Sequence, residues 1–204
     1  MTVIGAIEAG DWPAIVALEA EAYDAAGLTE GRRVLESRAA PGTSFAARAG
    51  DRVTGYVLAL PFPRFHAPDL TQPTVSASPI PGASGSASPS ASASSLVSAS
   101  PPESAFAVPG VSGSASRGGD LHLHDLVVAA GERGRGLATR LHAHLLAAAA
   151  RTAYERISLV AVSGSSPFWA ALGYRPHPRV AVPRSYGAAA VYMSRGVGPL
   201  DGHR

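Results

Sequence analysis

A stretch of nearly fifty residues divides this chain into two flanks and limits what each flank can become. From Thr71 to Gly119 the sequence is dominated by Ser, Ala, Pro and Gly, with hardly any charge. Such a stretch buries too little apolar surface to offset the entropy lost on ordering it, so we predict a disordered loop over residues 71–119. The flanks, 1–70 and 120–204, each lack a complete sheet pattern. We therefore predict one domain interrupted by a long insertion, in preference to two domains joined by a linker.

The composition favours a globular protein of a reducing compartment. Hydrophobic residues make up 46% of the chain, and the absence of cysteine excludes disulfides and thiolate zinc sites. The amino-terminal segment has no basic region ahead of an apolar core, and no apolar run reaches the roughly 18 residues of a membrane span. We therefore expect a cytoplasmic protein that does not engage a membrane.

The charge pattern argues against a nucleic-acid-binding surface. All 17 basic side chains are arginine, they are scattered along the chain, and the net charge is only +2. Aromatic residues amount to 6%. A nucleic-acid platform would gather its basic and aromatic side chains into a stripe, so no nucleic-acid partner is expected.

The hydrophobic periodicity of the flanks predicts an α/β protein. Before the insertion, the sequence predicts a strand, two helices and a β-hairpin, over residues 3–7, 11–23, 29–39, 44–49 and 52–60. After the insertion, it predicts strands at 121–128, 156–162, 174–182 and 188–195, with helices at 135–151 and 166–172. Gly173 would end the short helix at 166–172 as a C-cap.

A glycine- and arginine-rich turn, "AAGERGRGLATR", joins the strand at 121–128 to the following helix. The first amides of a helix have no internal partners and carry the positive end of the macrodipole, so they suit a phosphate. Gly134 and Gly136 would let the backbone approach it, and Arg133 and Arg135 could add charged hydrogen bonds. A P-loop is excluded because the chain has no lysine, and the dinucleotide fingerprint lacks its third glycine, where Thr139 stands.

A third pattern fits this turn. "RGRGLA" (133–138) resembles the Arg/Gln-x-x-Gly-x-Gly/Ala signature of the GNAT acyltransferase superfamily, matching at Arg133, Gly136 and Ala138. "LHDLVV" precedes it, as the fourth strand does in many bacterial members, and "SLVAVSGSSPFWAALGY" resembles the family's fifth strand, short helix and "LGF/LGY" ending. "FAARAGDRVTGYVLAL" and "SYGAAAVYM" are similar to its second, third and last strands. The resemblance covers nearly all of the chain outside the insertion.

The resemblance implies a single GNAT domain, with a mixed central sheet and helices on both faces, that transfers an acyl group from acetyl-CoA or another acyl-CoA to an amine. The amides of the turn would hold the pyrophosphate. The end of the fourth strand would bind the pantetheine arm through its backbone, and the fourth and fifth strands would splay apart to admit the cofactor. The implied cofactor-binding residues are Leu126, Val127, Val128, Arg133, Gly134, Arg135, Gly136, Leu137, Ala138, Thr139, Ser163 and Phe168. For Phe168 and Trp169 the favoured interpretation is aromatic core packing.

Candidates for the general base lie on the fourth strand. Strand alternation predicts His122 and His124 on one face, and Asp125 with Leu121, Leu123 and Val127 on the other. A histidine has a suitable pKa near neutrality. The alternatives are that the histidines only hydrogen-bond at the cleft edge, that Asp125 braces the loop, or that water relays the proton.

The general acid, which would protonate the leaving thiolate, departs from the family's usual residue. The family's usual tyrosine falls at Trp169, whose indole cannot protonate a thiolate, so Tyr186 or Tyr192 would take that role unless solvent does. Ser163 replaces the family's usual asparagine. These departures leave an alternative function open, a catalytically weak GNAT-fold module that binds CoA as a sensor or scaffold.

No metal site is expected. His142 and His144 lie two residues apart on a predicted helix, so they diverge and should face solvent. The expected partners are an acyl-CoA and an amine acceptor, on a small molecule or on a peptide or protein, and the protein should be a monomer or a homodimer.

Overall fold

The computed structural model describes residues 1–74 and 119–198. Its strands are β1 (Thr2–Ala6), β2 (Phe45–Ala49), β3 (Arg52–Pro61), β4 (Asp120–Val128), β5 (Arg156–Ala161), β6 (Arg175–Pro176) and β7 (Val191–Gly196). Its α-helices are α1 (Trp12–Tyr23), α2 (Arg32–Ser37), α3 (Leu137–Arg151) and α4 (Ser166–Ala171). Short 3-10 turns are η1 (Ala9–Asp11), η2 (Asp24–Ala26), η3 (Ala130–Glu132) and η4 (Arg184–Tyr186). The predicted alternation of strands and helices is confirmed.

The strands form one mixed sheet in the order β1-β2-β3-β4-β5-β7-β6. Every neighbouring pair is antiparallel except β4 and β5, which run parallel. The pairing of β3 with β4 joins the two flanks of the insertion in the middle of the sheet, from Gly55 opposite Val128 to Pro61 opposite Leu121. The flanks therefore share one sheet.

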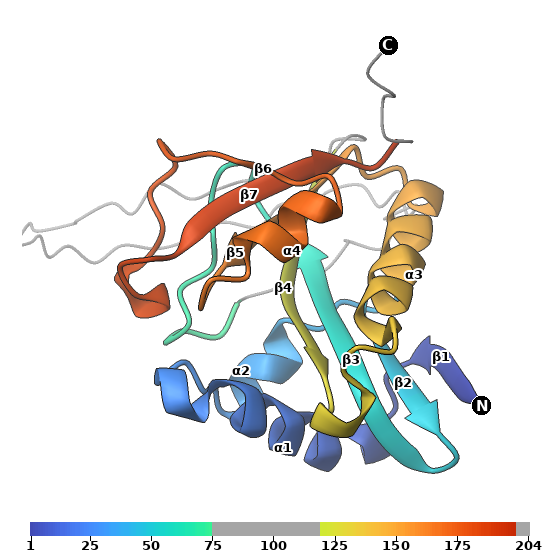
Figure 1. Ribbon diagram of the computed structural model, residues 1–204. Coiled ribbons are helices and arrows are strands. Elements are labelled where there is room, and N and C mark those ends of the chain that lie inside the picture. Colours follow the sequence, from blue (N-terminus) through green and yellow to red (C-terminus); the bar gives the residue numbers. More distant parts are fainter. Residues whose placement is uncertain (75–118, 199–204) are drawn as a thin grey trace, which may run out of the picture. The chain divides into compact units, whose positions relative to one another are not determined.

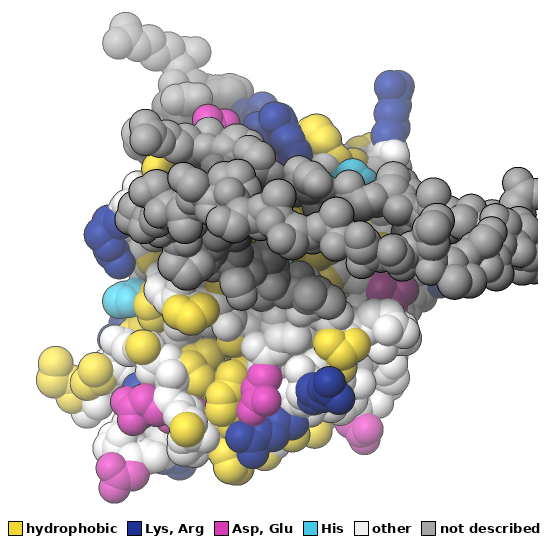
Figure 2. Space-filling view, turned by 180° about the vertical axis from the view of Figure 1, so that it is seen from behind, with side chains coloured by type: hydrophobic (Ala, Val, Ile, Leu, Met, Phe, Trp, Pro, Cys, Tyr) yellow, Lys and Arg dark blue, Asp and Glu magenta, His cyan; other side chains and the backbone are white. Residues whose placement is uncertain are grey.

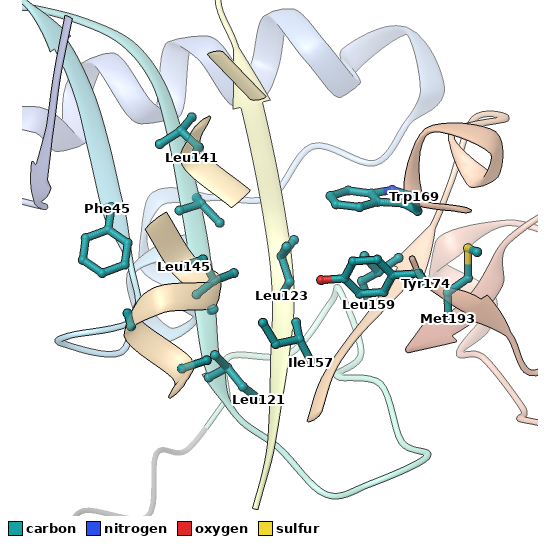
Figure 3. Close-up of a cluster of buried hydrophobic side chains, with 14 of the residues drawn as sticks. Phe45, Leu121, Leu123, Leu141, Leu145, Ile157, Leu159, Trp169, Tyr174 and Met193 are labelled. Carbon is teal, nitrogen blue, oxygen red and sulfur yellow. The ribbon is translucent and has the colours of Figure 1, made fainter. Parts of the chain in front are cut away.

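Helices cover both faces of this sheet (Figure 1). On one face, Leu141 and Leu145 of α3 pack in one core with Phe45 of β2 and Leu123 of β4 (Figure 3). Trp169 of α4 belongs to the same core. On the other face, α1 and α2 contribute Ile15 and Leu35 to a second core with Ala46, Tyr56, Leu58 and Val127. The buried apolar residues of α3 recur at helical spacing, as expected for an amphipathic helix on a sheet: Leu137, Leu141, Leu145, Ala148 and Ala149. The predicted mixed sheet with helices on both faces is confirmed.

The structure corrects three boundaries. The second helix spans only Arg32–Ser37 and not 29–39, and α3 begins at Leu137, two residues later than predicted. The strand predicted at 174–182 is reduced to Arg175–Pro176. Its sequence holds Pro176, Pro178 and, directly after it, Pro183, and proline cannot donate to a strand ladder, so pairing ends there.

The insertion predicted at 71–119 lies outside the described residues except at its two ends. Among the described residues at its start, the Gln72 carbonyl accepts a hydrogen bond of 2.7 Å from the Arg38 guanidinium. In the described ranges, no helix has the length and apolarity needed to cross a membrane. On the face that Figure 2 shows, the coloured basic side chains are interspersed with acidic and apolar ones.

Candidate functional site: a wedge between two parallel strands

The strands β4 and β5 pair only where they begin. Their register runs from Asp120 opposite Arg156 to His122 opposite Ser158 and stops there, although β4 continues to Val128 and β5 to Ala161 (Figure 1). The strands therefore diverge toward their carboxyl ends, as the resemblance implies. In α/β sheets, ligands bind at such carboxyl ends.

A cavity of about 290 Å³ lies in this wedge. The predicted cofactor-binding residues that line it come from β4, the glycine turn, the start of α3 and the segment after β5: Leu126, Val127, Val128, Arg133, Ala138, Ser163 and Phe168. Its size falls near the lower end of the range for small-molecule sites. Phe168 is 38% exposed, so it is not a core residue and its ring is accessible to a ligand, whereas Trp169 is buried beside it.

The glycine turn leaves room for an anion at the start of α3. Gly134 and Gly136 have φ values of 74° and 75°, in the left-handed region, and a Cβ added at either would meet nothing within 4 Å. The first bond of the α3 ladder runs from the Arg140 amide to the Gly136 carbonyl at 3.0 Å. The preceding amides, from Leu137 to Thr139, are therefore the unpaired donors of a helix start. This open, positively polarised turn fits a pyrophosphate.

Substitution at Gly136 should separate backbone strain from crowding. Gly136→Ala strains the left-handed backbone by about 1–2 kcal/mol, and Gly136→Asn should cost less because asparagine tolerates this conformation. Both place a side chain in the open space, so both should weaken CoA binding at least about tenfold, a loss of about 1.4 kcal/mol. Calorimetric titration and thermal melting check this. If Gly136→Asn bound CoA as tightly as the wild type, the turn would not hold the phosphates.

The two arginines of the turn, Arg133 and Arg135, have different hydrogen-bond partners. Arg133 Nε donates to the Val128 carbonyl at 3.2 Å, which draws its side chain toward the wedge. Arg135 Nη1 lies 3.3 Å from the Glu132 carboxylate in an exposed pair. An exposed pair is weak, so the Arg135 guanidinium can exchange this partner for an anion.

A bulge in β4 overturns the predicted faces of this strand. Leu58 pairs with Asp125 and Ala59 pairs with Leu123, so His124 is the extra residue of β4. A bulge shifts the alternation by one residue. Asp125 therefore points to the α1 side together with the histidines, and not with Leu121 and Leu123, which lie in the core under α3.

Two tyrosine hydroxyls bind the Asp125 carboxylate. Tyr23 of α1 donates to Oδ1 at 2.8 Å, and Tyr56 of β3 donates to Oδ2. Burial raises the pKa of Asp125, while His124 and the two hydroxyls oppose that rise. Asp125 thus ties α1, β3 and β4 together beneath the wedge. These contacts go to a helix and a strand and not to the loop that Asp125 was predicted, as an alternative, to brace. Its role as a base stays a prediction.

The two histidines of β4 have different surroundings. The His122 ring lies 3.1 Å from Ser158 Oγ, and burial, with His124 and Arg38 nearby, holds its pKa well below the usual range. His122 lines neither cavity described here. His124 lines the wedge, and its Nε2 contacts the Glu30 carboxylate. Only His124 of the two is therefore placed at the ligand space.

The two tyrosines predicted as candidate general acids, Tyr186 and Tyr192, lie in different surroundings. The Tyr192 hydroxyl accepts the Phe65 amide at 3.1 Å, and burial raises its pKa. Tyr186 of η4 is buried with its pKa raised by burial, and it lines a second, smaller cavity beside the wedge. His142, predicted to face solvent, is instead buried against Tyr174 with a ring-to-hydroxyl distance of 3.0 Å. This correction follows from α3, which turns His142 toward β6 and α4.

The second cavity, of about 40 Å³, contains residues that the sequence analysis missed. Glu19 of α1 and Glu30 of the α1–α2 connection line it, with Tyr23, His124 and Asp125. A signal existed, because Glu19 lies four residues after Ile15 and four before Tyr23, on the buried stripe of α1. A carboxylate on such a stripe needs an explanation. In the described residues, no group of three or more His, Asp or Glu side chains is arranged to hold a metal ion.

Comparison with known families bears directly on this architecture. Residues 96–174 match the family model described as the acetyltransferase (GNAT) family. This part of the chain, less than half of its 204 residues, is therefore similar to GNAT acetyltransferases. No curated protein matches the chain.

Several solved structures share the fold of this chain at low sequence identity. N-acetylglutamate synthase from Neisseria gonorrhoeae, complexed with coenzyme A and N-acetyl-glutamate, aligns with a TM-score of 0.61 and 14% identity over 98% of this chain. The chain spans only 36% of that synthase. Ard1 from Thermoplasma volcanium aligns with a TM-score of 0.59 and 12% identity, covering 97% of this chain and 99% of its own. The ribosomal-protein-S18-alanine N-acetyltransferase from Escherichia coli gives 0.56 and 11%, covering 100% and 99%.

Proposed function

We propose that this GNAT domain is an acyl-CoA-dependent N-acyltransferase that moves an acetyl group from acetyl-CoA to a primary amine. The observation that carries the proposal is the continuity of the wedge, which reaches from Arg133 and Ala138 at the start of α3 to His124 and Asp125 at the bulge. An anion site at one end and buried polar groups at the other suit a long phosphorylated ligand that ends in a reacting group. The synthase complex with coenzyme A supports the choice of ligand.

Acyl-CoA would supply an activated acyl carbon carried as a thioester. The amides from Gly134 to Thr139 would hold its pyrophosphate, with Arg133 and Arg135 adding charged hydrogen bonds. The backbone from Leu126 to Val128 would bind the pantetheine arm, because the unpaired edge of β4 faces the wedge. Backbone amides at this edge also suit the charge that develops on a carbonyl oxygen during transfer.

The acceptor is a primary amine of a small molecule or of a peptide or protein, and the protein acts in the cytoplasm as a monomer or homodimer. The similarity to the ribosomal-protein-S18-alanine N-acetyltransferase supports an amine acceptor. His124, Asp125 and Tyr186 remain the candidates for moving protons near the acceptor, since all three line the smaller cavity.

Calorimetry with the full chain, followed by a thiol-release assay, tests the proposal. CoA should bind and ATP should bind far more weakly, and acetyl-CoA with a panel of amines should release free thiol. Saturable CoA binding with no thiol release on any acceptor would favour the CoA-binding sensor or scaffold. Absence of CoA binding would overturn the proposal.

A further inference from the structure

The smaller cavity opens beside the wedge. Both cavities are lined by five of the same residues: Tyr23, His124, Asp125, Val160 and Val162. The smaller one adds Glu19, Leu28, Glu30, Leu70 and Tyr186. A group bound there would therefore lie next to the end of the wedge at the β4 bulge.

Polar atoms without partners face this cavity. Glu19 Oε1 accepts the Glu30 amide at 2.6 Å, but Glu19 Oε2 has no hydrogen-bond partner among the described residues. The same holds for Glu30 Oε1 and for the Tyr186 hydroxyl, and all three residues are more than nine-tenths buried. Buried polar atoms are normally satisfied, so the cavity lacks a donor. A ligand that carries several N–H groups would supply it.

The charges around the cavity are unbalanced toward the negative. Three carboxyl groups, those of Glu19, Glu30 and Asp125, line the cavity. The two basic groups beside them both contact Glu30, because Arg38 Nη2 lies 3.7 Å from Glu30 Oε1 and His124 Nε2 contacts Glu30 Oε2. The groups around Glu19 on the packed elements are Tyr23, Glu30, Arg38, Tyr56, His124, Asp125 and Tyr186. Arg38 is largely engaged elsewhere, because its Nη2 also donates to the Asp69 and Gln72 carbonyls. Among the described residues, Glu19 thus forms no ion pair with a cation.

We propose that this cavity is the acceptor site, that it takes a primary ammonium group on a slender, unbranched carrier, and that Glu19 both binds this ammonium and removes its proton. The inference rests on the proposed function and names its substrate class. A cavity of about 40 Å³ has room for about three water-sized groups, because a single water needs roughly 10–15 Å³, so it fits an ammonium and the first carbons of an unbranched carrier. Three carboxyl groups would repel an anionic acceptor such as glutamate.

The acceptor nitrogen loses two protons during the transfer, and Glu19 takes the first of them. The ammonium gives one proton to the Glu19 carboxylate, and the neutral nitrogen then forms the bond to the acyl carbon as the carbon–sulfur bond breaks. The second proton lost by the nitrogen goes to the leaving thiolate, and Glu19 returns its proton to solvent. Burial raises the pKa of Glu19 to about 7, with Asp125 and Glu30 adding to the rise. Such a pKa suits a base that works near neutral pH.

The test compares Glu19→Gln with Glu21→Gln, a matched change at an exposed position of the same helix. With butylamine as acceptor, Glu19→Gln should lower kcat/KM at least about 100-fold, while the Kd of CoA and the behaviour of Glu21→Gln stay at wild-type values. The kcat/KM of the wild type should rise with pH through about pH 7, and the kcat/KM of Glu19→Gln should not show this rise. Glutamate should be a poor acceptor for every variant.

A stability measurement distinguishes this role from a structural one. Because the pKa of Glu19 is raised from 4.5 to about 7 by folding, its ionisation costs stability progressively as the pH rises between these values. Glu19→Gln should therefore melt above the wild type at pH 8 and close to it at pH 4. A carboxylate that only holds the fold together would give a loss instead.

The outcomes separate the two proposals. Butylammonium should raise the melting temperature of the wild type without acetyl-CoA and should not raise that of Glu19→Gln, a readout that needs no turnover. If CoA does not bind, the proposed function fails, whatever butylammonium does. If thiol release occurs with glutamate as readily as with butylamine, or survives in Glu19→Gln, the acceptor site is wrong and the transferase function stands.

Discussion

Asp125→Ala should destabilise the protein by about 2–5 kcal/mol, because it leaves the Tyr23 and Tyr56 hydroxyls without their acceptor. Tyr56 is fully buried in the core under α1, so its hydroxyl cannot turn to solvent. An unpaired buried hydroxyl costs roughly 1–3 kcal/mol. Urea unfolding at pH 7, followed by circular dichroism, measures the loss.

A double-mutant cycle with Tyr56→Phe isolates the bond itself. The double variant should be less destabilised than the sum of the single variants by about 1–3 kcal/mol, since each single change leaves a partner unpaired. Glu21→Ala, on the exposed side of α1, should change stability by less than about 0.5 kcal/mol. Strictly additive losses would mean that the Tyr56–Asp125 bond does not form in solution.

Gly55→Ala should cost about 1–3 kcal/mol, although alanine ordinarily suits a strand at least as well as glycine. A Cβ at Gly55 would lie 2.9 Å from the Val127 carbonyl oxygen, 3.3 Å from Leu141 Cδ1 and 3.4 Å from a Val128 methyl. The carbonyl belongs to β4 and cannot move without shifting the strand. Since Val127 and Val128 also line the wedge, CoA binding should weaken along with stability.

Gly31→Ala provides the control for Gly55. A Cβ there meets nothing within 4 Å, and the residue has an ordinary φ of −73°. Gly31 is the N-cap of α2, where alanine is less favourable than glycine, but alanine also lowers the entropy of the unfolded chain, so the net change should stay below about 1 kcal/mol. Equal losses at the two glycines would show that crowding against β4 is not the cause.

Local chemistry made the framework of the site predictable. The turn from Arg133 to Gly136 has a strand before it and an apolar-periodic helix after it, and each signal depends only on neighbours in the sequence. The β2–β3 hairpin is equally local, and Gly50 takes the left-handed φ of 61° that its turn needs. The resemblance to GNAT proteins rested on the same local motifs.

The faces of β4 could not be read in this way. Alternation assumes an unbroken ladder, and the bulge at His124 depends on pairing with Leu58 and Ala59, more than sixty residues away. The bulge brings Asp125 to the side of α1, where the two tyrosines bind it. His142 was misplaced for a related reason, because only the packing of α3 shows that Tyr174 lies against it.

The sequence by itself determined most of the elements, the glycine turn before α3 and the resemblance to GNAT proteins, because helix periods, strand runs and glycine conformations are set by near neighbours. The tertiary structure alone decided which ionisable groups share a cavity. Glu19 and Glu30 lie before the insertion and His124 and Asp125 after it, and only the pairing of β3 with β4 brings these carboxyls and the imidazole together. Burial in this shared environment raises the pKa of Glu19 and of Asp125, and no local sequence pattern records that burial.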